Sequence, residues 1–146
     1  MNDVDTRITL ARRWVALRVP FLHLGRDRNG SDCIGLLVYS IGHDEKDVPA
    51  YSRDPHHGLL ERELERVFGP PVVTAGREGV QAEQLRVGDV VAMAYGRGNP
   101  RHVGFIAEHP VYAGHLSMIH TDAMVGEVTE HSIDDHWLAR IRKVHR

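Results

Sequence analysis

The sequence contains one cysteine, Cys33, and eleven histidines, and this combination points to thiol chemistry. A cysteine nucleophile needs a nearby base that takes its proton and a third group that fixes the tautomer of that base. We expect Cys33 to be the nucleophile, His102 the base and His120 the residue that orients His102. A lone cysteine can also be a small buried hydrophobe, so the elements around these residues must decide.

Cys33 stands at the junction of a polar loop and an apolar run, residues 33–39. Asp32 is a residue of N-cap type and Gly42 suits a helix end, so the spacing predicts that Cys33 occupies the first turn of a buried helix. Unpaired N–H groups and the helix dipole at that position can lower a cysteine pKa from about 8.5 to between about 3.5 and 7.5, and can bind an oxyanion. Gly35 is unfavourable inside a helix by about 1 kcal/mol, which suggests that another group approaches closely there.

Both candidate histidines are expected on strands. His102 opens a β-like run directly after a turn at residues 96–100, where it can project toward a helix N-terminus. His120 ends another run, in which alternation places Leu116, Met118 and His120 on one face. A polar ring that shares a face with two core residues needs a partner, and a ring nitrogen of His102 would provide one.

The elements expected to position these residues are helices in the first half of the chain and strands in the second half. Helical periodicity is found over residues 5–18 and 59–68, and Gly69 and the prolines after it stop the second helix. Short β-like runs follow, at residues 90–95, 102–107, 116–120, 125–131 and 141–145. Helices first and strands afterwards predict an α+β fold, with N-terminal helices packed on a central antiparallel sheet of about five strands.

Composition and charge restrict the class of protein. A chain of 146 residues, 42% hydrophobic and 26% charged, can bury a core without disulfides, and we expect a single domain over residues 1–146. The net charge of −2 favours no nucleic-acid partner, and no apolar run is long enough for membrane insertion. The acidic start at residues 1–5 lacks the features of a secretory signal, so we expect synthesis in the cytoplasm without a signal peptide.

The remaining histidines raise the question of a metal site. Those that could be imagined as ligands are His56, His57, His109, His115, His131 and His136. Adjacent histidines and histidines in loops are more often exposed, and the sequence has no HExxH pattern and no cluster of histidines with carboxylates. We therefore expect no metal and no cofactor.

Four stretches in a fixed order make the interpretation specific. They are Asp32-Cys33-Ile34-Gly35-Leu36, Leu85-Arg86-Val87-Gly88-Asp89-Val90-Val91, His102-Val103-Gly104-Phe105-Ile106 and Ile119-His120-Thr121. Their order and spacing, over roughly residues 14–120, resemble the signatures of the NlpC family of papain-like cysteine peptidases, which cleave peptide bonds in the stem peptides of bacterial peptidoglycan. The resemblance implies that Cys33 is the nucleophile, His102 the base and later the acid, and His120 the third member of the triad.

Two further stretches are similar to the phage-tail and gene-transfer-agent branch of this family. One is Pro20-Phe21-Leu22-His23 followed by Gly25-Arg26, and the other is the segment at residues 131–141. This similarity implies a protein that is made in the bacterial cytoplasm, is carried by the virion tail and acts on the cell wall. Its expected partners are a peptidoglycan stem peptide and phage tail-tip proteins.

Four residues that precede Cys33 in the sequence are candidates for substrate or oxyanion contacts. Phe21 stands where many family members carry a tyrosine whose hydroxyl faces the oxyanion, so this role would fall to a backbone N–H and to His23. Arg26 would bind a stem-peptide carboxylate, since arginine recognises carboxylates with paired hydrogen bonds, and Asp32 directly precedes the nucleophile. The segment between the two histidines is longer than is usual in the family, which would place the loop at residues 108–114 beside the site.

Two alternatives to a peptidoglycan peptidase stay open. The fold could serve as a structural module of a phage tail tip, in which catalysis is weak or lost. It could also carry the same acyl-enzyme chemistry to another substrate, as an amidase or an acyltransferase. The sequence does not indicate which stem-peptide bond would be cleaved.

Overall fold

The structure is a computed structural model that describes residues 1–42, 47, 51–52 and 58–146. In these ranges the helices are α1 (Val4–Ala16), α2 (Cys33–Ile41), α3 (Leu59–Phe68), the short 3-10 helix η2 (Ala82–Gln84) and α4 (Asp135–Leu138). The strands are β1 (Arg26–Asp27), β2 (Gly30–Ser31), β3 (Val73–Thr74), β4 (Val90–Met93), β5 (His102–Glu108), β6 (Leu116–His120), β7 (Thr129–Ser132) and β8 (Ile141–His145).

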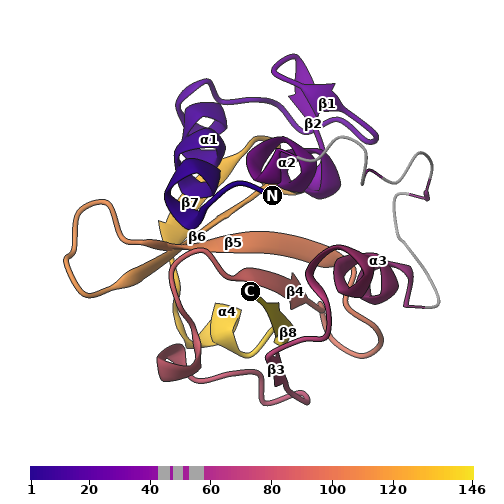
Figure 1. The fold of residues 1–146 in the computed structure, drawn as a ribbon, viewed down its shortest axis with the longest axis vertical. Coiled ribbons are helices and arrows are strands. Elements are labelled where there is room, and N and C mark those ends of the chain that lie inside the picture. Colours follow the sequence, from indigo (N-terminus) through magenta and orange to yellow (C-terminus); the bar gives the residue numbers. More distant parts are fainter. Residues whose placement is uncertain (43–46, 48–50, 53–57) are drawn as a thin grey trace.

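The strands of the second half form an antiparallel sheet. In the described part of the chain it has six strands in the order β3-β8-β4-β5-β6-β7, and β1 and β2 form a separate small hairpin (Figure 1). The prediction of an α+β fold with N-terminal helices on an antiparallel sheet is confirmed. The sheet has one strand more than expected, because β3 has only two residues and therefore shows no alternation in the sequence.

Both N-terminal helices begin at an aspartate cap, and α1 (Val4–Ala16) starts one residue earlier and ends two residues earlier than the predicted range 5–18. The Asp3 carboxylate accepts a hydrogen bond from the Thr6 N–H at 2.8 Å and caps α1, two residues before the predicted start. The Asp32 carboxylate caps α2 in the same way, and Gly42 ends it with φ at 72°, a conformation that glycine adopts without a steric cost. Cys33 is therefore the first residue of α2, as predicted.

Side chains on the two faces of the sheet enter two different hydrophobic clusters. Val90 and Ala92 of β4 belong to the cluster that contains the buried faces of α1, α2 and α3. Their neighbours Val91 and Met93 belong to the second cluster, where Trp137 of α4 also packs. Because side chains alternate between the two faces of each strand, one face of the sheet packs against a layer of helices and the other packs against the segment around α4 (Figure 1).

None of the described helices is both long enough and apolar enough to cross a membrane.

Candidate active site

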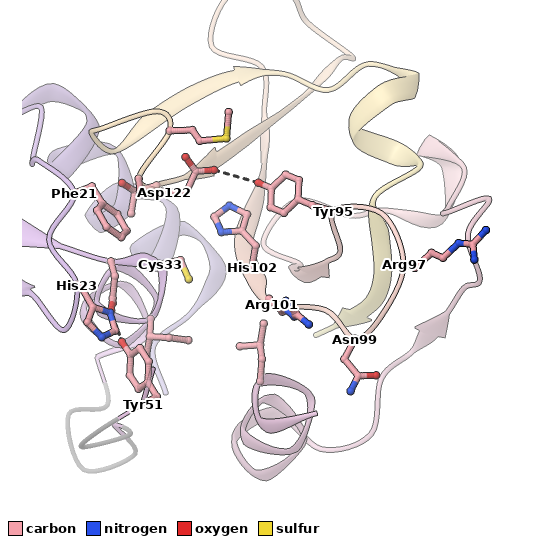
Figure 2. A pocket seen from close by; sticks show the side chains of 16 residues that line it. Phe21, His23, Cys33, Tyr51, Tyr95, Arg97, Asn99, Arg101, His102 and Asp122 are labelled. Atoms are coloured by element: carbon pink, nitrogen blue, oxygen red, sulfur yellow. Dashed lines mark hydrogen bonds and ion pairs between the residues drawn. The ribbon is translucent and has the colours of Figure 1, made fainter. Parts of the chain in front are cut away.

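Cys33 lies in a pocket between the N-terminus of α2 and the ends of β4, β5 and β6. The pocket has a volume of about 310 Å³, and His102 and Asp122 line it with Cys33. Figure 2 shows Cys33 projecting from α2 toward the side of the pocket that His102 forms. Among the described residues, no hydrogen bond joins the Cys33 sulfur to His102 in this state.

The close approach expected at Gly35 is an internal contact. A β-carbon at this position would lie 2.2 Å from the carbonyl oxygen of Gly25 and 2.5 Å from the hydroxyl of Ser31. Both distances are far below van der Waals contact, so the hairpin of β1 and β2 can lie against α2 only because position 35 has no side chain.

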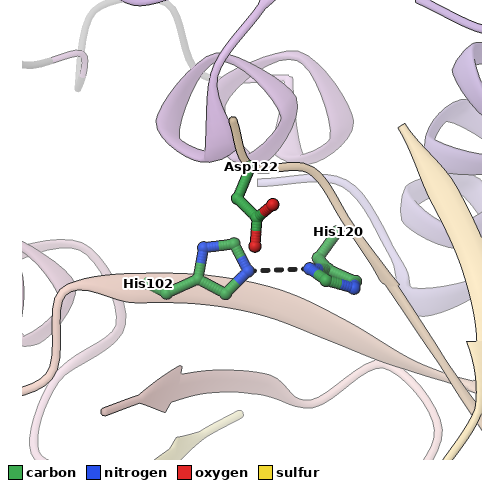
Figure 3. A group of neighbouring side chains, drawn as sticks. All are labelled: His102, His120 and Asp122. Carbon is green, nitrogen blue, oxygen red and sulfur yellow. Dashed lines mark hydrogen bonds between the residues drawn. The ribbon is translucent and has the colours of Figure 1, made fainter. Parts of the chain in front are cut away.

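His102 and His120 form a hydrogen-bonded pair. Nε2 of His102 lies 2.8 Å from Nδ1 of His120 (Figure 3). Only 4% of the surface of His102 and none of that of His120 is exposed. His102 is the first residue of β5 and His120 the last of β6, and antiparallel pairing places these two strand ends at the same edge of the hairpin. Buried polar rings are expected to be paired, and each ring satisfies the other here.

The row of imidazoles continues beyond this pair. Nε2 of His120 lies 2.7 Å from Nε2 of His131, and Nδ1 of His131 lies 2.8 Å from the backbone carbonyl oxygen of Ser132. The indole of Trp137 packs against both rings, with centroid distances of 4.9 Å to His120 and 4.7 Å to His131. In the sequence His131 stood out only as an imagined metal ligand, because its distance from His120 depends on the pairing of β6 with β7.

The expectation of a low cysteine pKa is wrong for the free protein. Burial, first, and the negative charge of Asp32, second, raise the pKa of Cys33 to about 12. The backbone N–H groups of Val103, Ile34 and Cys33 itself act in the opposite direction and are outweighed. The side chain is partly exposed to the pocket, but too little to offset the loss of hydration at the sulfur. The thiol is therefore protonated at neutral pH.

Burial also decides the charge of the two histidines. It is the largest cause of the lowered pKa of both His102 and His120. The carboxylate of Asp122 raises the pKa of His102, whereas Arg140 and His131 lower it. At pH 7 both rings are therefore neutral, and a neutral imidazole can accept a proton.

Asp122 and Tyr95 complete the wall of the pocket around His102, and the sequence analysis identified neither. The Tyr95 hydroxyl donates a hydrogen bond to Asp122 at 3.1 Å, and the Asp122 carboxylate points toward the two histidines (Figures 2 and 3). Burial is the largest cause of a raised pKa of Tyr95, so its hydroxyl keeps its proton and remains a donor. Both residues lie just beyond strand ends, where periodicity gives no signal.

His102, His120 and Asp122 also form a cluster of possible metal ligands. Their nearest nitrogen and oxygen atoms all lie within 4.8 Å of one another. Two nitrogens that bind one tetrahedral zinc ion at 2.0–2.1 Å would be about 3.3 Å apart. The 2.8 Å between the two rings is instead the length of a hydrogen bond, so the arrangement fits a histidine pair better than a metal centre. His56 and His57 lie outside the described residues.

Of the four residues predicted to contact substrate or the oxyanion, three line the pocket and one does not. Phe21, His23 and Asp32 line the pocket. Arg26 is not among the residues that line it, and its guanidinium donates to Asp32 at 3.0 Å and to Asp47 at 2.7 Å. Its charge therefore serves to neutralise two carboxylates of the protein itself.

Tyr51 is a further pocket residue that the sequence analysis missed. Its hydroxyl donates to Asp32, and its ring lies edge to face with the imidazole of His23, with centroids 5.5 Å apart. Asp32 also accepts from the N–H groups of Leu24 and Gly35, each at 2.9 Å. The carboxylate beside Cys33 is thus held by groups from three separate segments.

The loop at residues 108–114 does not lie beside the site. It connects β5 to β6 at the end of the hairpin opposite to His102 and His120, and Glu108 pairs there with Leu116 (Figure 1). The expectation assumed that extra residues between the histidines would reach the pocket. The added length instead extends the far end of the hairpin, because strand pairing fixes both histidines at the other end.

The model of the NlpC/P60 family matches residues 18–146. The fold is similar to that of the NlpC/p60 domain of the peptidoglycan hydrolase SagA, with a TM-score of 0.60, 16% sequence identity and 99% of each chain covered. No curated protein matches the sequence.

Proposed function

The chain belongs to the NlpC/P60 family, and on that premise we propose that it is a cysteine peptidase that hydrolyses peptide bonds in the stem peptides of bacterial peptidoglycan. One observation carries the proposal: the only cysteine begins α2 in a pocket whose facing wall is a buried, hydrogen-bonded histidine pair. The substrate class is supported by the family and by the solved domain of similar fold, which comes from a peptidoglycan hydrolase.

The reaction begins from uncharged partners. The raised pKa of Cys33 keeps the thiol protonated, and the lowered pKa of His102 keeps its ring free to accept a proton. As the sulfur attacks the scissile carbonyl carbon, its proton passes to His102, so no stable thiolate is needed beforehand. Hydrogen bonds between catalytic groups are often long in a free enzyme and tighten when substrate binds, which is how we interpret the present separation of Cys33 and His102.

The second half of the reaction uses the same histidine in reverse. The oxyanion of the tetrahedral intermediate is bound by the backbone N–H of Cys33 at the first turn of α2. When the intermediate collapses, the C–N bond breaks and His102 gives its proton to the leaving amine. A water molecule then loses a proton to His102 and attacks the thioester, which releases the new carboxyl group and restores the thiol.

Digestion of purified peptidoglycan by the wild-type protein and by Cys33→Ala, followed by mass spectrometry of the products, tests this proposal. An endopeptidase releases fragments cut within the stem, and Cys33→Ala releases none while its circular dichroism spectrum stays unchanged. Release of whole stem peptides would indicate an amidase, and transfer of the acyl group to an added amine would indicate an acyltransferase. Absence of any product with wild-type protein would favour the structural module, and full activity of Cys33→Ala would overturn the role of the thiol.

We also propose that the protein is carried in a phage tail. This proposal is supported by the similarity of residues 20–26 and 131–141 to tail-associated family members. Peptide mass spectrometry of purified particles from the source bacterium would detect the chain if it is carried there. Its absence from such particles would remove this proposal and leave the peptidase assignment untouched.

A further inference from the structure

We propose that His131, held by the backbone carbonyl of Ser132, is a positioning residue that sets the tautomer of His102 through His120. The proposal rests on the proposed function in one respect, namely that His102 is the base for Cys33. Its structural basis is the unbroken row of hydrogen bonds from His102 to the Ser132 carbonyl, with ring contacts of 2.8, 2.7 and 2.8 Å.

The direction of this row follows from its last member. A backbone carbonyl oxygen can only accept a hydrogen bond, so Nδ1 of His131 must carry the proton that it donates to Ser132. In its neutral form His131 has one N–H, and Nε2 of His131 is then an acceptor. Since His120 contacts that nitrogen at 2.7 Å, the donor in this contact is Nε2 of His120.

The same reasoning continues to His102. The single N–H of His120 is donated to His131, so Nδ1 of His120 is an acceptor. The 2.8 Å contact is therefore a hydrogen bond that Nε2 of His102 donates. The lone pair of His102 is then on Nδ1, the nitrogen that takes no part in the row. If the row ran in the opposite direction, Nδ1 of His102 would carry the proton and could accept none from Cys33.

His120 is buried, so its second ring nitrogen is hydrogen-bonded by another residue of the protein and not by water. None of the surface of His120 is exposed, so its second nitrogen depends on His131. Trp137 lies against both rings and restricts their rotation, with centroids 4.9 and 4.7 Å away. A positioning group two hydrogen bonds from the base can thus act on the base without contact with the substrate.

The tautomers can be measured directly in the wild-type protein. Imidazole ¹⁵N chemical shifts distinguish protonated from unprotonated ring nitrogens, and we expect Nε2–H for His102 and His120 and Nδ1–H for His131 at pH 7. A spectrum in which His120 carries its proton on Nδ1 would overturn the proposal. This measurement requires neither activity nor a variant.

Two variants and a control test the effect on catalysis. His131→Phe keeps a flat ring but removes the acceptor, and we expect kcat to fall about 10- to 100-fold at unchanged KM, with mixed tautomers at His102. His131→Gln retains a side-chain carbonyl that can accept from His120, and should restore most of the rate. His136→Phe, at an exposed position near Trp137, should leave both the rate and the tautomers as in the wild type.

The outcomes separate this inference from the proposed function. If the wild type leaves peptidoglycan intact but shows the three expected tautomers, the substrate assignment fails and the row of imidazoles stands. If the wild type is active and His131→Phe retains its kcat and the tautomer of His102, the positioning role of His131 is wrong. If both glutamine and phenylalanine lower the rate equally, an acceptor at position 131 is not what His102 requires.

Discussion

Nε2 of His102 lies 2.8 Å from Nδ1 of His120, and this contact joins the first residue of β5 to the last residue of β6. The two positions are 18 residues apart in sequence but meet at one edge of an antiparallel hairpin. The proposed base and the residue proposed to orient it are therefore held by the strand register, which the core residues of both strands fix.

Replacement of His120 tests this contact. We expect His120→Ala to lower kcat by about 10- to 100-fold, because the N–H of His102 loses its acceptor and the ring its orientation. His120→Gln offers a carbonyl at a similar reach and should lose less. The measurement is steady-state hydrolysis of a soluble stem peptide, and equal rates for His120→Ala and the wild type would contradict the orienting role.

The charge state of Cys33 can be followed through its reactivity. With a pKa of about 12, the rate of alkylation by iodoacetamide should rise about tenfold per pH unit from pH 7 to pH 10 without a plateau. The same thiol in the urea-unfolded protein serves as the control and should level off near its ordinary pKa of about 8.5. A folded-state plateau below pH 8 would show that the free protein holds a thiolate.

Asp32 has opposite effects on structure and on the thiol. Asp32→Asn removes a negative charge beside Cys33, so alkylation at pH 8 should become faster. The protein should also lose about 1 to 3 kcal/mol of stability in urea, because Arg26 loses one of its carboxylate partners. Asp47→Asn is the matched control: it takes the other carboxylate from Arg26 and should affect stability without changing the thiol rate.

Acid should destabilise the protein in a defined pH window. Burial holds the pKa of His102 and His120 below the unfolded value of about 6.5, so the unfolded chain binds more protons as the pH falls through that value. The contribution of these groups is complete above about pH 6.5 and is lost below it, by up to about 1.4 kcal/mol per pH unit for each ring.

Urea unfolding at pH 7 and pH 5 measures this loss. His120→Gln removes one of the two groups and should reduce the difference in unfolding free energy between the two pH values. A wild-type protein that is equally stable at both pH values would show that neither ring is kept neutral by burial.

Gly35→Ala should destabilise the protein, although alanine is the better helix former by about 1 kcal/mol. The added carbon would lie 2.2 Å from the Gly25 carbonyl oxygen, and overpacking of this kind costs about 1 to 3 kcal/mol. Thermal unfolding measures the effect. A melting temperature equal to or above that of the wild type would show that the β1–β2 hairpin can move away without loss.

The elements that carry strong local signals could be predicted from the sequence. The helix predicted over residues 59–68 has the same bounds as α3 (Leu59–Phe68), because its apolar stripe and the glycine that ends it, Gly69, are local features. The positions of Cys33 on α2, of His102 on β5 and of His120 on β6 follow equally from neighbouring residues. The catalytic roles of the three residues stay predictions until variants are assayed.

The parts that the sequence did not reveal depend on contacts between distant segments. His131 reaches His120 because β6 and β7 pair with Met118 opposite His131, a register that no local pattern reports. Asp122 approaches His102 from beyond the end of β6. The helix dipole at Cys33 was anticipated, but burial of the sulfur and the charge of Asp32 outweigh it, and burial depends on the complete fold.

Cys33, the proposed nucleophile, belongs to the helical layer, whereas the three imidazoles come from the sheet. A nascent or partly unfolded chain with a formed sheet but an undocked α2 would hold the histidines without their thiol. The chemistry proposed for Cys33 therefore requires the two layers to be packed against each other.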